Sequence, residues 1–122
     1  MKAKVLIVDD SALTRRSLRQ ILETAGCEVV EAEDGLSALE RYYLEKPDVV
    51  LLDLVMRGMY GLEVIQKLRE LDAEARIVVV SADIQSSSHE LAEQAGAKAF
   101  INKPFEKAEI LVALDTALAG AR

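Results

Sequence analysis

The chain has 122 residues, of which 51% are hydrophobic, so it can form one compact domain, residues 1–122, with a sizeable core. Its formal net charge is −6, which argues against a nucleic-acid backbone as a direct partner. The apolar run 5–8 is too short for a signal peptide or a membrane span, and the single cysteine, Cys27, excludes an internal disulfide. We therefore expect a cytoplasmic protein with no membrane insertion.

Short apolar runs alternate with amphipathic stretches along the chain. The runs are bounded by polar or turn residues, which predicts strands at 5–8, 28–32, 49–52, 77–80 and 99–102. Apolar residues recur at helical spacing between them, which predicts helices over 12–25, from Asp34 to about residue 45, and over 61–71, 87–95 and 106–118.

This strict alternation predicts an α/β fold, a (βα)5 doubly wound sheet of five parallel strands with right-handed crossovers. The runs 5–8, 49–52 and 77–80 are unbroken, as expected for strands that are covered on both faces. Ligands bind beyond the carboxyl ends of the strands in such sheets. The residues that follow the strands are therefore the candidates for chemistry.

Four of the expected strands end in polar residues: Asp9 and Asp10 after the first, Asp53 after the third, Ser81 after the fourth and Lys103 after the fifth. In the flavodoxin-like version of the sheet these four strands lie side by side, so the residues would converge on one rim. Two carboxylates about 5 Å apart repel by roughly 3 kcal/mol at an effective dielectric near 20. Lys103 and a hard divalent cation would offset this repulsion, and Mg²⁺ (or Mn²⁺) suits carboxylates and phosphate oxygens. Three carboxylates, one ammonium and one divalent ion carry no net formal charge.

Asp53 is the predicted nucleophile, because a carboxylate can attack phosphorus and form an aspartyl phosphate. Asp9 and Asp10 would hold the metal, while Ser81 and Lys103 would bind phosphoryl oxygens. A lone Asp at a strand end is most often a helix cap or a turn residue. The whole set at the ends of adjacent strands is hard to obtain by chance, and it favours a phosphoryl-accepting site.

These residues lie in motifs that resemble the receiver domains of two-component signalling, in particular the chemotaxis-type, CheY-like single-domain regulators. The motifs are Val-Asp-Asp-Ser at 8–11, Leu-Leu-Asp-Leu at 51–54, Met56, Gly61, Ser81-Ala82, Gly96-Ala97 and Lys103-Pro104. The resemblance covers essentially the whole chain and implies a flavodoxin-like sheet with strand order 2-1-3-4-5. It also implies a sensor histidine kinase as phosphoryl donor, a phosphoacceptor at Asp53, and metal ligands from Asp9, Asp10, Asp53 and the backbone carbonyl of Val55.

In the same resemblance, Ser81 and Phe100 form the switch that remodels the face made by the fourth helix, fifth strand and fifth helix. The Lys103–Pro104 peptide would be cis. Val55 and Asp83 occupy positions that tune the phosphoryl lifetime, while Arg57 stands where the family often has Pro. The chain would then act by binding an effector protein whose identity is unknown, catalysing only its own phosphorylation and dephosphorylation. We expect a monomer, with weak dimerisation on phosphorylation as the alternative.

Other interpretations stay open. The chain is expected to lack an output domain, because it ends soon after the last helix, but it could also be a receiver cut from a longer regulator. A small Asp-dependent phosphatase is the alternative enzyme, although Val55 stands where such enzymes usually place a second acid. A flavodoxin-like cofactor site would place a flavin phosphate against Asp9 and Asp10, and a degenerate receiver would lack site residues that are present here. His89 is expected to be a solvated helix residue. Arg15 and Arg16 are also expected on a solvated face, although they could instead contact a kinase.

Overall fold

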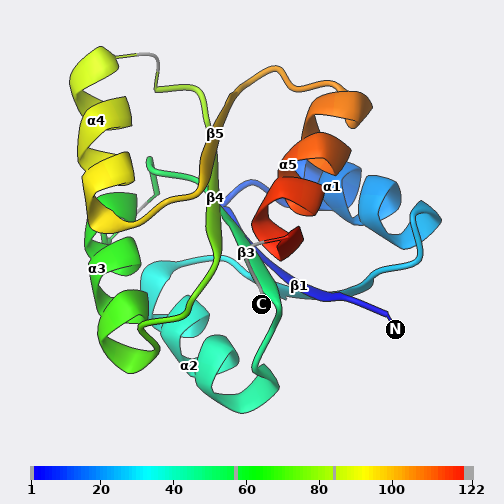
Figure 1. Cartoon of the computed structure of the whole chain (residues 1–122), viewed down its shortest axis with the longest axis horizontal. Helices are drawn as coiled ribbons and strands as arrows, with labels where there is room; N and C mark the ends of the chain where they lie inside the picture. Colours follow the sequence, from blue (N-terminus) through cyan, green and yellow to red (C-terminus); the bar gives the residue numbers. More distant parts are fainter. Residues whose placement is uncertain (1, 57, 84, 120–122) are drawn as a thin grey trace.

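The computed structural model describes residues 2–56, 58–83 and 85–119 and has the predicted alternation of strands and helices (Figure 1). In chain order the elements are β1 (Lys4–Val8), α1 (Ala12–Thr24), β2 (Glu28–Ala32), α2 (Gly35–Glu45), β3 (Val49–Leu52), α3 (Gly61–Leu71), β4 (Ile77–Ser81), α4 (Ser86–Ala95), β5 (Ala99–Asn102) and α5 (Lys107–Ala119).

Differences from the sequence prediction are confined to single residues at element ends. β4 continues through Ser81, because Ser81 still pairs with Asn102 of β5. α5 begins at Lys107, since Glu106 is its cap: the Glu106 carbonyl accepts the amides of Glu109 and Ile110. Such shifts are expected where a chain enters or leaves a helix or strand.

The five strands form one parallel sheet in the order β2-β1-β3-β4-β5. Figure 1 shows α1 and α5 on one face of the sheet and α2, α3 and α4 on the other. The predicted fold class and strand order are therefore confirmed. No helix within the described residues is long and apolar enough to cross a membrane.

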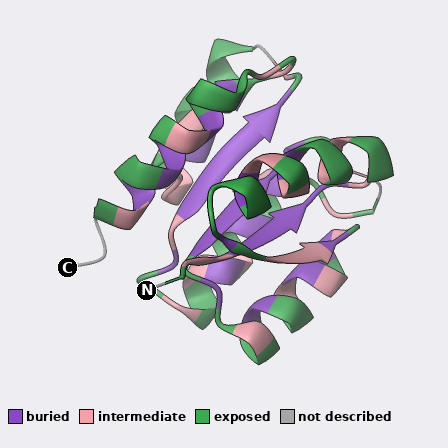
Figure 2. Ribbon diagram, turned by 90° about the vertical axis from the view of Figure 1, so that its right-hand side faces the viewer, coloured by how far each residue is buried: buried purple, intermediate pink, exposed green. Residues whose placement is uncertain are grey.

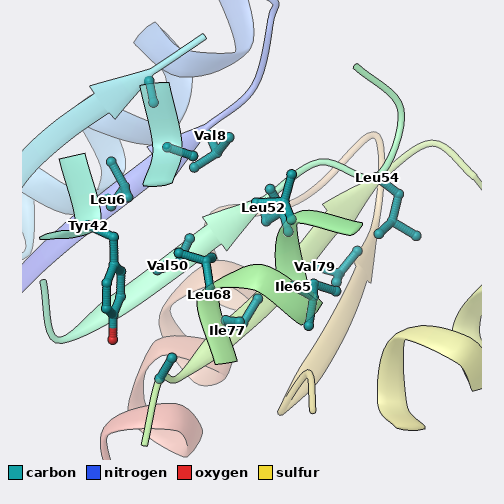
Figure 3. Close-up of a cluster of buried hydrophobic side chains, with 14 of the residues drawn as sticks. Leu6, Val8, Tyr42, Val50, Leu52, Leu54, Ile65, Leu68, Ile77 and Val79 are labelled. Atoms are coloured by element: carbon teal, nitrogen blue, oxygen red, sulfur yellow. The ribbon is translucent and has the colours of Figure 1, made fainter. Parts of the chain in front are cut away.

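Both faces of the central strands are buried, as Figure 2 shows. Alternate residues of β1, β3 and β4 enter two separate cores, because successive side chains of a strand point to opposite faces. Leu6, Leu52 and Val79 pack with α2 and α3, as seen in Figure 3. Ile7 and Leu51 pack with α1 and α5. Burial on both sides explains why these strands read as unbroken apolar runs.

The sheet register sets the position of the site. Val8 of β1 lies opposite Leu52 of β3, so the residues that follow them, Asp9 and Asp53, leave the sheet side by side. The Asp53 amide donates to the Val8 carbonyl at 3.0 Å, which extends the pairing by one bond. Because the strands are parallel, β4 and β5 end at the same edge.

Candidate phosphoryl-accepting site

Three carboxylates lie together at the carboxyl edge of the sheet. One oxygen each from Asp9, Asp10 and Asp53 lies within 4.8 Å of the other two. Asp9 and Asp53 are only 2% and 6% exposed, and Asp10 is half-buried. Burial weakens the screening that water gives to exposed charges, so the repulsion within this cluster is larger than on an open surface.

Lys103 reaches this cluster from the loop after β5. Its Nζ donates to Asp9 Oδ2 at 2.8 Å and to Asp53 Oδ2 at 3.2 Å. The Lys103 amide donates to the Ser81 carbonyl at 2.9 Å, and the Lys103–Pro104 peptide bond is cis. The ammonium thus lies between two carboxylates that come from neighbouring strands.

Burial and neighbouring charges have opposite effects on the pKa values of Asp9 and Lys103. Burial raises the pKa of Asp9, and the hydrogen bond and charge of Lys103 offset only part of this increase. Burial tends to lower the pKa of Lys103, but the hydrogen bond to Asp9 and the charges of Asp9 and Asp53 raise it overall. Lys103 therefore holds its proton more firmly than an unperturbed lysine, whereas ionisation of Asp9 is less favourable than that of an exposed carboxyl group.

Each buried carboxylate also holds its own loop. Asp9 Oδ1 accepts the Ser11 amide at 2.8 Å, and Asp53 Oδ1 accepts the Val55 amide at 3.1 Å. Ser11 in turn caps α1, since its Oγ accepts the Thr14 amide at 3.2 Å. These bonds fix the rotamers of the carboxylates, so their positions are set before any ligand binds.

The donor set fits a hard divalent cation. All three grouped side chains offer carboxylate oxygens, which Mg²⁺ prefers, and their spacing allows one ion to contact more than one of them. Lys103 contacts two of the three carboxylates, those of Asp9 and Asp53. Asp9, Asp10 and Asp53 are the residues that could hold this divalent cation. Val55 lies in the loop that begins at Asp53.

Ser81 and Asp83 lie on the β4 side of the same edge. Ser81 is fully buried, and its Oγ accepts the Asp83 amide at 3.2 Å. The Asp83 carboxylate accepts the hydroxyls of Ser88 at 2.7 Å and Tyr60 at 3.1 Å, and the amide of Gln85 at 3.1 Å. These bonds connect Asp83 to the start of α4 and to the residue before α3, which no sequence pattern indicated.

Phe100 is half-buried on β5, and its ring lies against His89 of α4, with centroids 3.6 Å apart and planes tilted by 55°. His89 is exposed, as expected, but the contact with Phe100 was missed because it depends on α4 lying beside β5. The side chain of Val55, two residues after Asp53, is 57% exposed. Arg57 lies outside the described residues.

Residues 5–115 match the response regulator receiver domain family. The chain belongs to this family, whose members are phosphorylation-dependent signalling switches of two-component systems and not metabolic enzymes. Within it the chain is CheY-like: the chemotaxis protein CheY of Bacillus subtilis is 43% identical over 119 residues, which cover 97% of this chain and 99% of that protein.

Two further comparisons bear on the site and on the length of the chain. A CheX–CheY complex from Borrelia burgdorferi with BeF3 and Mg²⁺ has a TM-score of 0.89 and 34% identity, covering 92% of this chain and 86% of the matched chain. A protein-glutamate methylesterase/glutaminase of Myxococcus xanthus is 50% identical over 104 residues, which cover 83% of this chain but 30% of that protein. Receiver sequences similar to this chain therefore occur both alone and within longer proteins.

Proposed function

We propose that this chain accepts a phosphoryl group from a sensor histidine kinase on Asp53, with Mg²⁺ (or Mn²⁺), and thereby changes its binding to an effector protein in the cytoplasm. The single observation that carries the proposal is the pair of contacts from Lys103 Nζ to Asp9 Oδ2 and Asp53 Oδ2 at a buried three-carboxylate cluster. Repulsion in such a cluster lowers the stability of the folded protein, and phosphoryl transfer at this site would explain why the cluster is present.

The chemical step is a displacement at phosphorus. An Asp53 carboxylate oxygen forms a new bond to phosphorus, the bond from phosphorus to the donor nitrogen or oxygen breaks, and the donor leaves with that electron pair. Asp9, Asp10, Asp53 and the Val55 carbonyl would hold Mg²⁺, which supplies positive charge for the phosphoryl oxygens. Lys103 supplies a second cation beside Asp53, since its Nζ already lies 3.2 Å from that carboxylate.

The readout would begin at Ser81. Its hydroxyl, which accepts the Asp83 amide at 3.2 Å, would turn to bind a phosphoryl oxygen on Asp53 and would lose that bond. Phe100 would then move inward, so that the surface of α4, β5 and α5 changes shape. The position of Phe100 supports this step, because this residue is half-buried on β5 and its ring contacts His89 of α4.

The Borrelia relative supports the choice of ligands, because its structure holds BeF3 together with Mg²⁺. An Asp-dependent phosphatase is less favoured: Val55, two residues after Asp53, has an aliphatic side chain that cannot act as a general acid. We further propose that residues 1–122 act as one receiver unit and that the unphosphorylated form is a monomer.

The decisive experiment is intact-protein mass spectrometry after incubation with acetyl phosphate. We expect one base-labile phosphoryl adduct that requires Mg²⁺ and is lost in Asp53→Asn, while Asp83→Asn still forms it. The circular dichroism spectrum of Asp53→Asn should match the wild type, which shows that the loss is chemical. An adduct on Asp53→Asn at the wild-type rate would refute the assignment of the nucleophile, and an adduct that forms equally well in EDTA would refute the metal.

A further inference from the structure

Arg15 has contacts that link α1, β2 and the acidic pair. Its Nη1 donates to the Asp9 backbone carbonyl at 2.6 Å, and its Nε donates to Glu31 Oε1 at 2.8 Å. The Arg15 side chain is only 14% exposed, although we expected it to lie on a solvated face of the helix. The periodicity of α1 could not indicate this position, because the partners of Arg15 belong to β1 and β2.

Glu31 holds the guanidinium in place. It lies on β2 opposite Ile7 of β1, and its second oxygen, Oε2, accepts Arg19 Nε at 2.6 Å. Burial opposes ionisation of Glu31, but hydrogen bonds and charges from Arg19 and Arg15 lower its pKa overall, so the carboxylate remains ionised at neutral pH. The planar guanidinium is thus fixed by charge-assisted bonds on two of its edges.

The carbonyl that Arg15 binds belongs to the peptide group between Asp9 and Asp10. The Asp9 amide is held too, since it donates to the Ala32 carbonyl of β2 at 3.2 Å. Together the two bonds set the orientation of the backbone from which both acidic side chains project. Rotation of this peptide plane would move Asp10 relative to Asp9, and hence the two candidate ligands relative to each other.

The contribution of Arg15 is geometric and not simply one of charge. Arg15, Arg19, Glu31 and Glu23 form one chain of ion pairs, because Arg19 Nη1 also donates to Glu23 Oε2 at 2.8 Å. Two cations and two anions leave this group with no net formal charge. Its field at the site is therefore weak, whereas its hydrogen bond to Asp9 is direct.

We propose that Arg15 is a positioning residue for the metal site: held by Glu31, it orients the Asp9–Asp10 peptide so that both carboxylates face one divalent ion. The inference rests on the proposed function, because it requires that Mg²⁺ binds at this cluster. Partners that orient metal ligands typically change metal affinity by about tenfold to a hundredfold when they are removed.

The test is the Mg²⁺ dissociation constant of Arg15→Lys, which keeps the charge but loses the planar pair of donors. The constant is obtained from the backbone amide shifts of residues 9–11 and 53–55 during a titration with Mg²⁺ alone. We expect affinity to fall by about tenfold or more. Glu31→Gln should weaken binding in the same direction, and the exposed neighbour Arg16→Lys is the matched control, expected to stay within about twofold of the wild type.

A merely structural role is distinguished by a second measurement. The acetyl phosphate reaction of Arg15→Lys should recover to near the wild-type rate once Mg²⁺ is saturating, whereas a folding defect would persist at every Mg²⁺ concentration. An unchanged dissociation constant in both Arg15→Lys and Glu31→Gln would overturn the role of Arg15. Should Arg15→Lys not fold, an unchanged constant in Glu31→Gln alone would overturn it. Absence of Mg²⁺-dependent shifts in the wild type would instead refute the proposed metal site.

Discussion

Lys103→Met removes the ammonium from the acidic cluster while keeping most of the side-chain length. At an effective dielectric of about 20, the contacts of 2.8 Å to Asp9 and 3.2 Å to Asp53 correspond to attractions of about 6 and about 5 kcal/mol. The cost of burying the charges cancels part of this gain, and removing one partner of a buried pair costs roughly 3–5 kcal/mol. We expect the free energy of unfolding without Mg²⁺ to fall by about 3 kcal/mol at about pH 7.

This loss should decrease in acid. The pKa of Asp9 is raised by burial, and Lys103 counteracts this increase, so the variant should have a still higher Asp9 pKa. A carboxyl group whose folded-state pKa exceeds its unfolded value destabilises the folded state when it is ionised, and this penalty disappears as the pH falls through the raised pKa. The stability difference between variant and wild type is therefore largest at neutral pH and becomes smaller as Asp9 is protonated.

The assay is urea denaturation followed by circular dichroism, in EDTA, across a pH series. Lys98→Met is the matched control, because Lys98 is exposed just before β5 and its loss should change stability by less than about 0.5 kcal/mol. The electrostatic account of the site would be wrong if Lys103→Met unfolded at the same urea concentration as this control. It would also be wrong if the difference grew as the pH was lowered.

Three further substitutions probe the readout and the scaffold. Ser81→Ala should still accept the phosphoryl group, but the phosphorylation-dependent NMR shifts of the α4–β5–α5 face should be lost; full shifts would disprove the switch role. Gly61→Ala would bring a Cβ within 2.6 Å of the Asp53 carbonyl, so unfolding measurements should show a loss of about 1–3 kcal/mol, and an unchanged midpoint would contradict this packing. Tyr42→Phe removes a 2.7 Å hydrogen bond to Asp72 that lowers the pKa of Asp72. The free energy of unfolding should fall by about 1–2 kcal/mol at neutral pH, and by less once acid protonates Asp72. A loss of stability that does not depend on pH would count against this bond.

Much of the fold could be predicted because its signals are local. β1, β3 and β4 are unbroken apolar runs, and the sheet buries them on both faces. The juxtaposition of Asp9, Asp53 and Lys103 was also predictable, because each follows a strand and parallel strands end at one edge. The position of these residues directly after strands therefore also indicates where they lie in the fold.

The contacts that sequence reasoning missed depend on how helices pack across the sheet. Arg15 contacts Glu31 and the Asp9 carbonyl, and Asp83 accepts bonds from residues on both sides of it in the chain. The ring of His89 lies on Phe100 only because α4 packs beside β5. The apolar periodicity of a helix gives no signal for the partner that one of its polar residues finds on another element.

The two sides of the site differ in how strongly their helices are anchored. α3 follows the loop that begins at Asp53 and buries three large aliphatic side chains, Val64, Ile65 and Leu68. α4 follows Ser81, and within 86–95, all of which the structure describes, it buries only Ser88 and Ala92. Burying one large aliphatic side chain contributes roughly 1.5–3 kcal/mol, so α4 is much more weakly attached than α3.

Native-state hydrogen exchange should reveal this difference. We expect the amides of α4 to exchange through an opening whose free energy is lower than that of α3 by about 2 kcal/mol or more. One new hydrogen bond from Ser81 to a charged acceptor supplies about 1–3 kcal/mol. This free energy is similar in size to the expected difference between the two helices, so such a bond can shift α4 more readily than α3. Equal opening free energies for α3 and α4 would mean that phosphorylation cannot shift α4 at so small a cost. The readout would then have to start from another element, and the loop that carries Val55 and Tyr60 would be the next to test.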